Sequence, residues 1–234
     1  MKRVGIIQSS YVPWRGYFDF IRSVDLFVIY DDVQYSTGSW RNRNQLKMRD
    51  GLRWLTVPVH ASVSRAIDET PLALDEGDWR PRHRRMLEEA LGTAPYFDDA
   101  LRLWQAGVAD EAASIGALNV RLLRAITEYL GIRTEIRMSR PYAARGAKTE
   151  RLIDLLQKVG ATTYVSGPTA RGYLDEGAFH RAGINLEYKS YDYEPYPQLW
   201  GPFVGTVSIL DLIANTGPRA PHYLASRTAN ACAA

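Results

Sequence analysis

Residues 4–30 read VGIIQSSYVPWRGYFDFIRSVDLFVIY, and this stretch decides the fold class. It begins with a short apolar run, Val4–Ser9, which is typical of a buried strand. Apolar side chains then recur at helical spacing, at Trp14, Tyr17, Phe18 and Ile21. A second apolar run, Leu26–Tyr30, lies between acidic residues. A strand, a helix and a strand within about 30 residues predict a parallel βαβ unit.

The rest of the chain indicates the same fold class, with a helical block in the middle. Apolar periodicity predicts helices at 80–91, 97–104 and 110–130, and short strands alternate with helices again from residue 134. We predict an α/β fold with a mostly parallel sheet, which could be HUP/Rossmann-like, and a mainly helical subdomain inserted at about 78–131. The polar segment 31–51 is expected to be largely loop. Residues 1–224 are expected to form a single domain, and residues 225–234 a disordered tail.

The composition excludes several classes of protein. The chain has 234 residues, a single cysteine (Cys232) and a net charge of +3. A disulfide framework and a cysteine-built zinc site are therefore excluded, and no apolar stretch is long enough for a transmembrane helix or a signal peptide. We expect a cytoplasmic protein without membrane contact. The small net charge does not support sequence-specific nucleic-acid binding.

Polar side chains follow the predicted strands at the point where each strand ends. The clusters are Gln8-Ser9-Ser10, Asp31-Asp32 and Ser166-Gly167. In an α/β sheet, ligands bind at the carboxyl ends of the strands, so we expect the functional site there. Ser10 could alternatively do no more than cap the next helix. Gly16 is unusual inside a helix and indicates the close approach of a ligand or of another backbone.

The strongest candidate for a binding segment follows the second strand. Asp31-Asp32-Val33-Gln34-Tyr35 leads into Trp40-Arg41-Asn42-Arg43-Asn44, which is dense in hydrogen-bond donors and acceptors. Arginine makes up 24 of the 29 basic residues of the chain, and a GC-rich genome could explain that number but not this placement. Guanidinium groups bind carboxylates and phosphates in a bidentate way, so the segment could clamp an anionic ligand. The alternative is a solvated loop with local ion pairs.

Histidine is the natural candidate for a general base, and His83 is the strongest of the four histidines. Its arginine-rich neighbourhood, Arg80–Arg85, is expected to lower its pKa and favour the neutral form. The alternative is an exposed helix histidine. Motifs for a P-loop, a dinucleotide fold, a serine nucleophile elbow and a metal site are absent, so we predict no metal and no cofactor. The aromatic segment Tyr188–Trp200 could bind a sugar or a nucleobase, or pack onto the core.

Several of these segments together resemble the WbqC-like protein family. The resemblance runs in order through Ile6-Ile7-Gln8, Tyr11–Phe18, Asp31–Tyr35, Trp40–Asn44, Trp54–Val59, His83, Ala94–Phe97, Ser166-Gly167, Tyr173-Leu174, Ser208–Leu212 and Asn215–Gly217. Ser9-Ser10 is a departure, because many relatives have Gln-Pro-Asn there. The resemblance implies an enzyme of surface-polysaccharide or natural-product biosynthesis that handles an amino sugar or a comparable amine and an activated acyl or aminoacyl group.

Three functional hypotheses follow. The first is a transferase that forms an amide or ester, with a carrier protein, CoA or aminoacyl-tRNA as possible donor. Its general base would be His83, with Asp31 and Asp32 orienting the amine. The predicted substrate-binding residues are Gln8, Tyr11, Trp14, Gln34, Trp40, Arg41, Asn42, Arg43, Asn44, Ser166 and Gly167. The second is an ATP-dependent HUP-type ligase or nucleotidyltransferase, although Pro13–Gly16 replaces the usual His-x-Gly-His. The third is a non-catalytic module that binds carbohydrate or a carrier protein.

Overall fold

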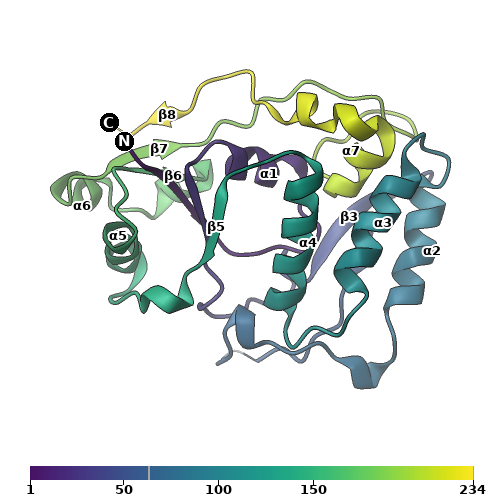
Figure 1. Ribbon diagram of the computed structural model, residues 1–234, viewed down its shortest axis with the longest axis horizontal. Helices are drawn as coiled ribbons and strands as arrows, with labels where there is room; N and C mark the ends of the chain where they lie inside the picture. Colours follow the sequence, from purple (N-terminus) through teal and green to yellow (C-terminus); the bar gives the residue numbers. More distant parts are fainter. Residues whose placement is uncertain (63, 234) are drawn as a thin grey trace.

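A six-stranded sheet forms the centre of the computed structural model, which describes residues 1–62 and 64–233 (Figure 1). Its strand order is β5-β2-β1-β6-β7-β8, in which the first five strands are parallel and β8 is antiparallel to β7. The strands are β1 (Arg3–Ile7), β2 (Leu26–Ile29), β5 (Glu135–Met138), β6 (Thr163–Ser166), β7 (Asn185–Tyr188) and β8 (Ala231–Cys232). The strand order reverses beside β1, as in doubly wound sheets. The predicted α/β class and mostly parallel sheet are confirmed.

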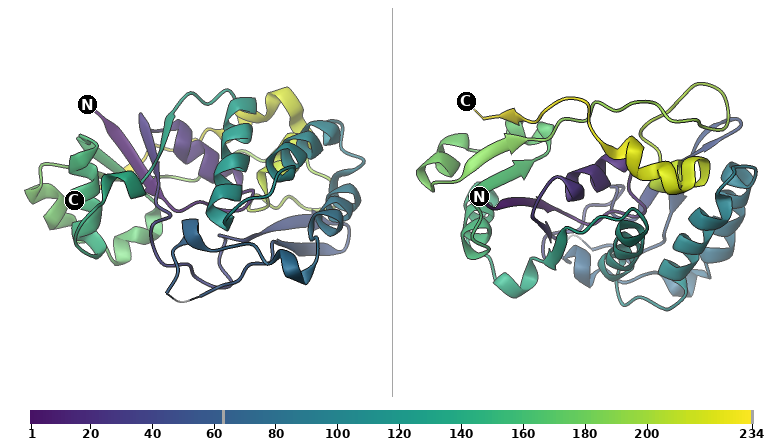
Figure 2. Two further views of the ribbon diagram at one scale, coloured as in Figure 1. Left: turned by 60° about the horizontal axis from the view of Figure 1, so that its bottom comes forward. Right: turned by 45° about the horizontal axis from the view of Figure 1, so that its top comes forward.

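Helices cover both faces of this sheet and create two hydrophobic cores (Figure 2). Successive side chains of a strand point to opposite faces, so Phe27 and Ile29 of β2 join one core while Leu26 and Val28 join the other. The first core contains α1 (Arg15–Arg22) and the second contains α5 (Lys148–Lys158) and α6 (Glu176–Arg181). The cores thus lie on opposite sides of β1.

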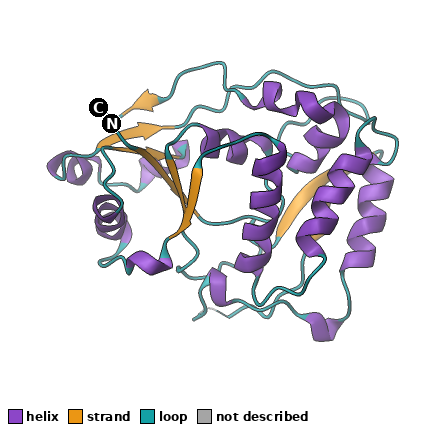
Figure 3. Cartoon of the chain, in the orientation of Figure 1, coloured by secondary structure: helices purple, strands orange, loops and turns teal. Residues whose placement is uncertain are grey.

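The predicted helical block lies on the first face and shares its core. It consists of α2 (Arg80–Leu91), α3 (Phe97–Val108) and α4 (Ile115–Tyr129), which stand side by side in Figure 3 and pack with α7 (Ile209–Thr216). Helix α4 begins later than predicted, because the Ser114 hydroxyl caps it by accepting a hydrogen bond from the Ala117 amide at 3.1 Å. Short 3-10 helices occupy Ile67–Glu69, Leu74–Glu76, Arg140–Tyr142, Pro168–Gly172 and Gly217–Leu224. None of the helices in the described part of the chain could cross a bilayer.

Two segments differ from the sequence-based expectation. Residues 31–51 are not simply a loop, because β3 (Arg43–Met48) pairs antiparallel with β4 (Gly51–Thr56). Asn44, Leu46 and Met48 of β3 are buried as alternate residues, and Lys47 between them is buried too. The polar residues among them concealed this strand pattern.

The tail that we expected to be disordered is instead bound along β7. The Ala233 amide donates to the Leu186 carbonyl at 2.9 Å, and the Arg227 amide donates to the Asp192 carbonyl at 2.8 Å. These backbone hydrogen bonds hold residues of the tail in place although its side chains are small and polar. The prediction of disorder is therefore wrong for the described residues of this tail.

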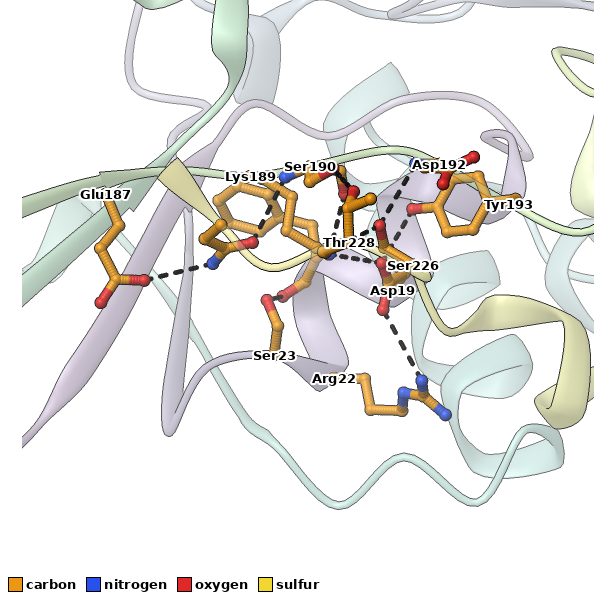
Figure 4. A network of polar contacts seen from close by, with 12 residues as sticks. Asp19, Arg22, Ser23, Glu187, Lys189, Ser190, Asp192, Tyr193, Ser226 and Thr228 are labelled. Carbon is orange, nitrogen blue, oxygen red and sulfur yellow. Dashed lines mark hydrogen bonds and ion pairs between the residues drawn. The ribbon is translucent and has the colours of Figure 1, made fainter. Parts of the chain in front are cut away.

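A buried ion pair fastens α1 to the segment after β7 (Figure 4). The Lys189 ammonium lies 2.5 Å from an Asp19 carboxylate oxygen, and both side chains are only 5% exposed. The same carboxylate oxygen accepts a hydrogen bond from the Tyr193 hydroxyl at 2.8 Å. Because Asp19 is the common partner, its removal leaves the Lys189 charge buried and unpaired.

We predict that Asp19→Ala lowers the free energy of unfolding by about 3–5 kcal/mol, the usual effect of breaking a buried pair on one side. Urea denaturation measures this loss. The matched control is Glu89→Ala on the exposed surface of α2, which is expected to change stability by less than about 0.5 kcal/mol. Equal effects of the two substitutions would show that the buried pair is not important for stability.

Candidate functional site

The carboxyl end of β1 separates two cavities, one on each face of the sheet. The first has a volume of about 290 Å³ and lies against the β1–α1 turn. Its wall contains four aromatic side chains, Trp14, Tyr17, Trp40 and Tyr191. The polar residues Ser10, Asn44 and Thr206 and the cationic side chain of Arg41 also line it. A cavity with apolar walls and few polar groups is the usual form of a small-molecule site.

The β1–α1 turn gives the first cavity its shape. A Cβ atom at Gly16 would lie 2.3 Å from the Trp14 ring, so glycine is required there for this indole to pack against the helix. The group that approaches Gly16 is thus the neighbouring side chain and not a ligand or another backbone. Asn44 on β3 supports the turn, because its amide nitrogen donates to the Tyr11 and Val12 carbonyls at 3.2 and 3.1 Å.

Among the described residues, Arg41 is the one charged residue that lines this cavity. One guanidinium nitrogen donates to Gln8 Oε1 at 3.1 Å, and the buried Nε has no partner. No carboxylate of the described residues forms an ion pair with Arg41. Burial lowers the pKa of Arg41, while Tyr17 and Asp31 act weakly in the opposite direction. The first cavity therefore contains a cation whose charge the protein does not neutralise by direct contact.

Asp31 lies beneath this site and does not line it. It is fully buried, and one carboxylate oxygen accepts the Ser9 amide at 2.7 Å while the other has no partner. Burial raises its pKa to about 6. Asn119 of α4 donates to the Ser9 hydroxyl at 3.0 Å and to the Arg41 carbonyl at 2.8 Å. These contacts fix the position of Ser9, which follows Gln8, and of the Arg41 backbone.

Asp32 points to the other face of the sheet. Its carboxylate accepts the Ser139 hydroxyl and binds Arg151 of α5 at 2.7 Å. The adjacent carboxylates Asp31 and Asp32 are therefore separated and do not form a paired acidic site.

His83 lies in the core and lines neither cavity. Nε2 is 2.9 Å from the Thr56 carbonyl, which can only accept, so this nitrogen carries the proton. Nδ1 then accepts from the Tyr11 hydroxyl at 3.1 Å, and that hydroxyl accepts from Trp104 at 2.7 Å. Burial, more than the neighbouring Arg82, lowers the His83 pKa to about 4. Since both ring nitrogens are occupied, we leave His83 out of the proposed site.

The remaining predicted residues divide into two groups. The residues that line a cavity are Gln8, Trp14, Trp40, Arg41 and Asn44. The others lie elsewhere. Asn42 donates to the Val57 carbonyl at 2.8 Å, and the Arg43 guanidinium stacks 4.2 Å from the centre of the Trp54 ring. Gln34 is exposed, Tyr11 is buried beside His83, and Ser166 and Gly167 line neither cavity. Tyr17 and Thr206 line the first cavity but were not predicted from the sequence, and for Tyr191 the sequence left open whether it binds a ligand or packs onto the core.

The second cavity has a volume of about 500 Å³ and lies on the α5 face. Ile7 lines both cavities, and Gln8 lines the second while its side chain accepts the hydrogen bond from Arg41 of the first. The Gln8–Arg41 contact is therefore the partition between them. In the described part of the chain, no group of three or more His, Cys, Asp or Glu residues is arranged to hold a metal ion.

We predict that Asp31 and His83 have opposite effects on the pH dependence of stability. The raised pKa of Asp31 gives stability that is present below pH 3.8 and lost as the pH rises through about 6. The lowered pKa of His83 gives stability that is present above pH 6.5 and lost as the pH falls through about 4. Each contribution is about 3 kcal/mol.

Urea denaturation at pH 4 and pH 7 separates the two contributions. Relative to the unmodified protein, Asp31→Asn is expected to gain stability between pH 4 and pH 7, whereas His83→Gln is expected to lose it. Parallel pH profiles of the three proteins would contradict the burial of these groups.

Comparison with known proteins assigns the chain to a family. A model of the WbqC-like protein family matches residues 8–223. The chain is also 47% identical over 229 residues to the uncharacterized protein Rv1507c of Mycobacterium tuberculosis. The aligned segment covers 96% of this chain and 98% of the mycobacterial protein. No solved structure matches. The family match includes most of the residues that line the first cavity, and the chain belongs to the WbqC-like protein family.

Proposed function

We propose that this protein is a transferase that moves an acyl or aminoacyl group onto an amine, with the amine bound in the first cavity. The observation that carries the proposal is the Arg41 guanidinium, which lines an aromatic cavity without a carboxylate partner. A guanidinium without a carboxylate partner is available to stabilise negative charge that develops on a bound substrate during a reaction. The amine would be an amino sugar or a natural-product amine, as family membership suggests, and the reaction would be cytoplasmic.

The environment of the cavity favours the nucleophilic form of such an amine. A positive charge nearby and apolar walls both lower the pKa of a bound ammonium group. Arg41 supplies the charge, and the rings of Trp14 and Tyr191 supply the walls. The amine would therefore lose its proton on binding, without a histidine base. The hydroxyls of Ser10 and Thr206, which also line the cavity, could accept hydrogen bonds from it.

Arg41 also fits the charge that develops during acyl transfer. The amine nitrogen attacks the acyl carbonyl carbon, a C–N bond forms, and negative charge develops on the carbonyl oxygen. A fixed guanidinium donor stabilises such an oxyanion strongly when water is excluded. The bond from the carbonyl carbon to the leaving group then breaks, and the leaving group takes up the proton that the amine nitrogen loses.

A second candidate function is an ATP-dependent ligase. The doubly wound strand order β5-β2-β1-β6-β7 favours it, because such sheets commonly bind nucleotides at the carboxyl ends of their strands. The ligase would form its own activated acyl group and release pyrophosphate. The transferase would require a donor that is already activated, such as acyl-CoA, an acyl carrier protein or an aminoacyl-tRNA.

The test is an incubation of the protein with a panel of amines and each class of donor, with ATP plus free acid as a separate arm, followed by mass spectrometry for the amide. We predict that Arg41→Ala lowers kcat/KM about 10²–10³-fold, the usual effect of removing an oxyanion donor. Arg43→Ala is the matched control, because Arg43 is two residues away and stacks on Trp54 outside the cavity.

The control is expected to keep kcat/KM within about threefold of the unmodified protein. Product that appears only with ATP and free acid would favour the ligase. Ligand binding without product in any arm would contradict both enzymes and favour a binding module.

A further inference from the structure

Cationic side chains line the second cavity, as in a binding site for an anion. Lys148 and Arg151 of α5 line it, and no Asp or Glu is among its lining residues. Arg151 binds the Asp32 carboxylate at 2.7 Å, so its position is fixed and its charge is largely neutralised. Lys148 is exposed and has no ion pair with any described residue. The cavity therefore has a net positive wall.

The first turn of α5 adds to this positive potential. Ala147 is its N-cap residue and provides no side-chain hydrogen bond to the helix. The first amide groups of a helix lack intrahelical acceptors and attract anions. Residues 146–149 line the cavity, so the beginning of α5 lies at its wall.

An independent observation comes from β6, on another wall of the cavity. Tyr164 lines the cavity and is only 3% exposed. Its hydroxyl accepts from Ser166 at 3.4 Å, and no described residue accepts the proton of the Tyr164 hydroxyl. Burial raises the pKa of Tyr164, so this hydroxyl stays protonated and can donate. Gln8 is similar, because its side-chain oxygen accepts from Arg41 while no described residue accepts from its amide nitrogen.

We propose that the second cavity binds the phosphate group of a phosphorylated small molecule, with Lys148, the first-turn amides of α5, Tyr164 and Gln8 as donors. A phosphate carries acceptor oxygens enough for several such donors. The identification of this cavity as the donor site rests on the proposed transferase function. The phosphorylated donor would lie on one side of Gln8 and the amine on the other.

The test measures binding without turnover, by isothermal titration with pyrophosphate, ATP and CoA in the absence of divalent metal. At least one probe is expected to bind with a Kd below about 1 mM. Tighter binding of ATP would identify a nucleotide ligand, tighter binding of CoA would identify a CoA thioester, and equal binding of all three would indicate recognition of phosphate alone.

The decisive variant is Ala147→Asp. The new carboxylate places a negative charge beside the first turn of α5, because Ala147 directly precedes the helix, although Lys148 has a left-handed backbone with φ 49°. It therefore competes with the ligand, and we expect a higher Tm together with binding that is weaker by at least about tenfold. Lys148→Gln is also expected to weaken binding. The matched control Lys158→Gln, at the other end of α5 and paired with Asp154 at 2.6 Å, is expected to bind normally.

The proposal is overturned if none of the three probes binds, or if Ala147→Asp and Lys148→Gln bind like the unmodified protein. Arg41→Ala separates the two proposals, because it is expected to lose acyl transfer and to retain phosphate binding. Phosphate binding without any transfer product would thus leave this site standing while the transferase function failed.

Discussion

The hydrogen bond between Gln8 and Arg41 is the contact at which the two candidate sites meet. It joins the end of the central strand to the segment before β3, and it lies between the two cavities. Asn119 and Asp31 hold the backbone on both sides of it. The protein thereby holds a guanidinium beside apolar walls without a carboxylate partner, which proteins rarely do unless a ligand compensates the charge.

The doubly wound sheet explains why this contact lies where two ligands could meet. Helices α1 and α4 pack on one face and α5 on the other, so the carboxyl end of β1 is open to both sides. An aromatic cavity with one cation suits a ring-bearing amine, whereas a larger cavity with Lys148 and uncapped amides suits an anion. Such a division of roles fits a reaction with two substrates that bind on either side of the Gln8–Arg41 contact.

Local patterns predicted the fold well, because they depend on residues close in sequence. The strand–helix–strand start, the helix at 80–91 and the parallel sheet all follow from apolar periodicity. Strand β3 was missed because only Leu46 and Met48 of its residues are apolar, and its other buried residues, Asn44 and Lys47, are polar. The tail was misjudged because its order comes from hydrogen bonds to β7 and Asp192, which composition does not reveal.

The site was predicted in part, for a related reason. Strand ends and arginine placement drew attention to Gln8 and Arg41, which line the cavities. Residue type alone could not distinguish a polar side chain that faces a cavity from one that is satisfied in the core. His83 and Asn42 both belong to the second kind, since their hydrogen bonds go to carbonyls of β4 and the residue after it. Tyr191 reaches the first cavity only because the segment after β7 folds back over α1.

The central claim, that Arg41 is held for a ligand and not for the fold, is tested most directly by the stability of Arg41→Met without ligand. Methionine keeps most of the side-chain length and removes the charge. The free energy of unfolding, measured in urea, is expected to rise by about 1–3 kcal/mol, because a partly buried charge without a carboxylate partner is removed. A decrease of more than about 1 kcal/mol would show that Arg41 stabilises the fold and would contradict the account.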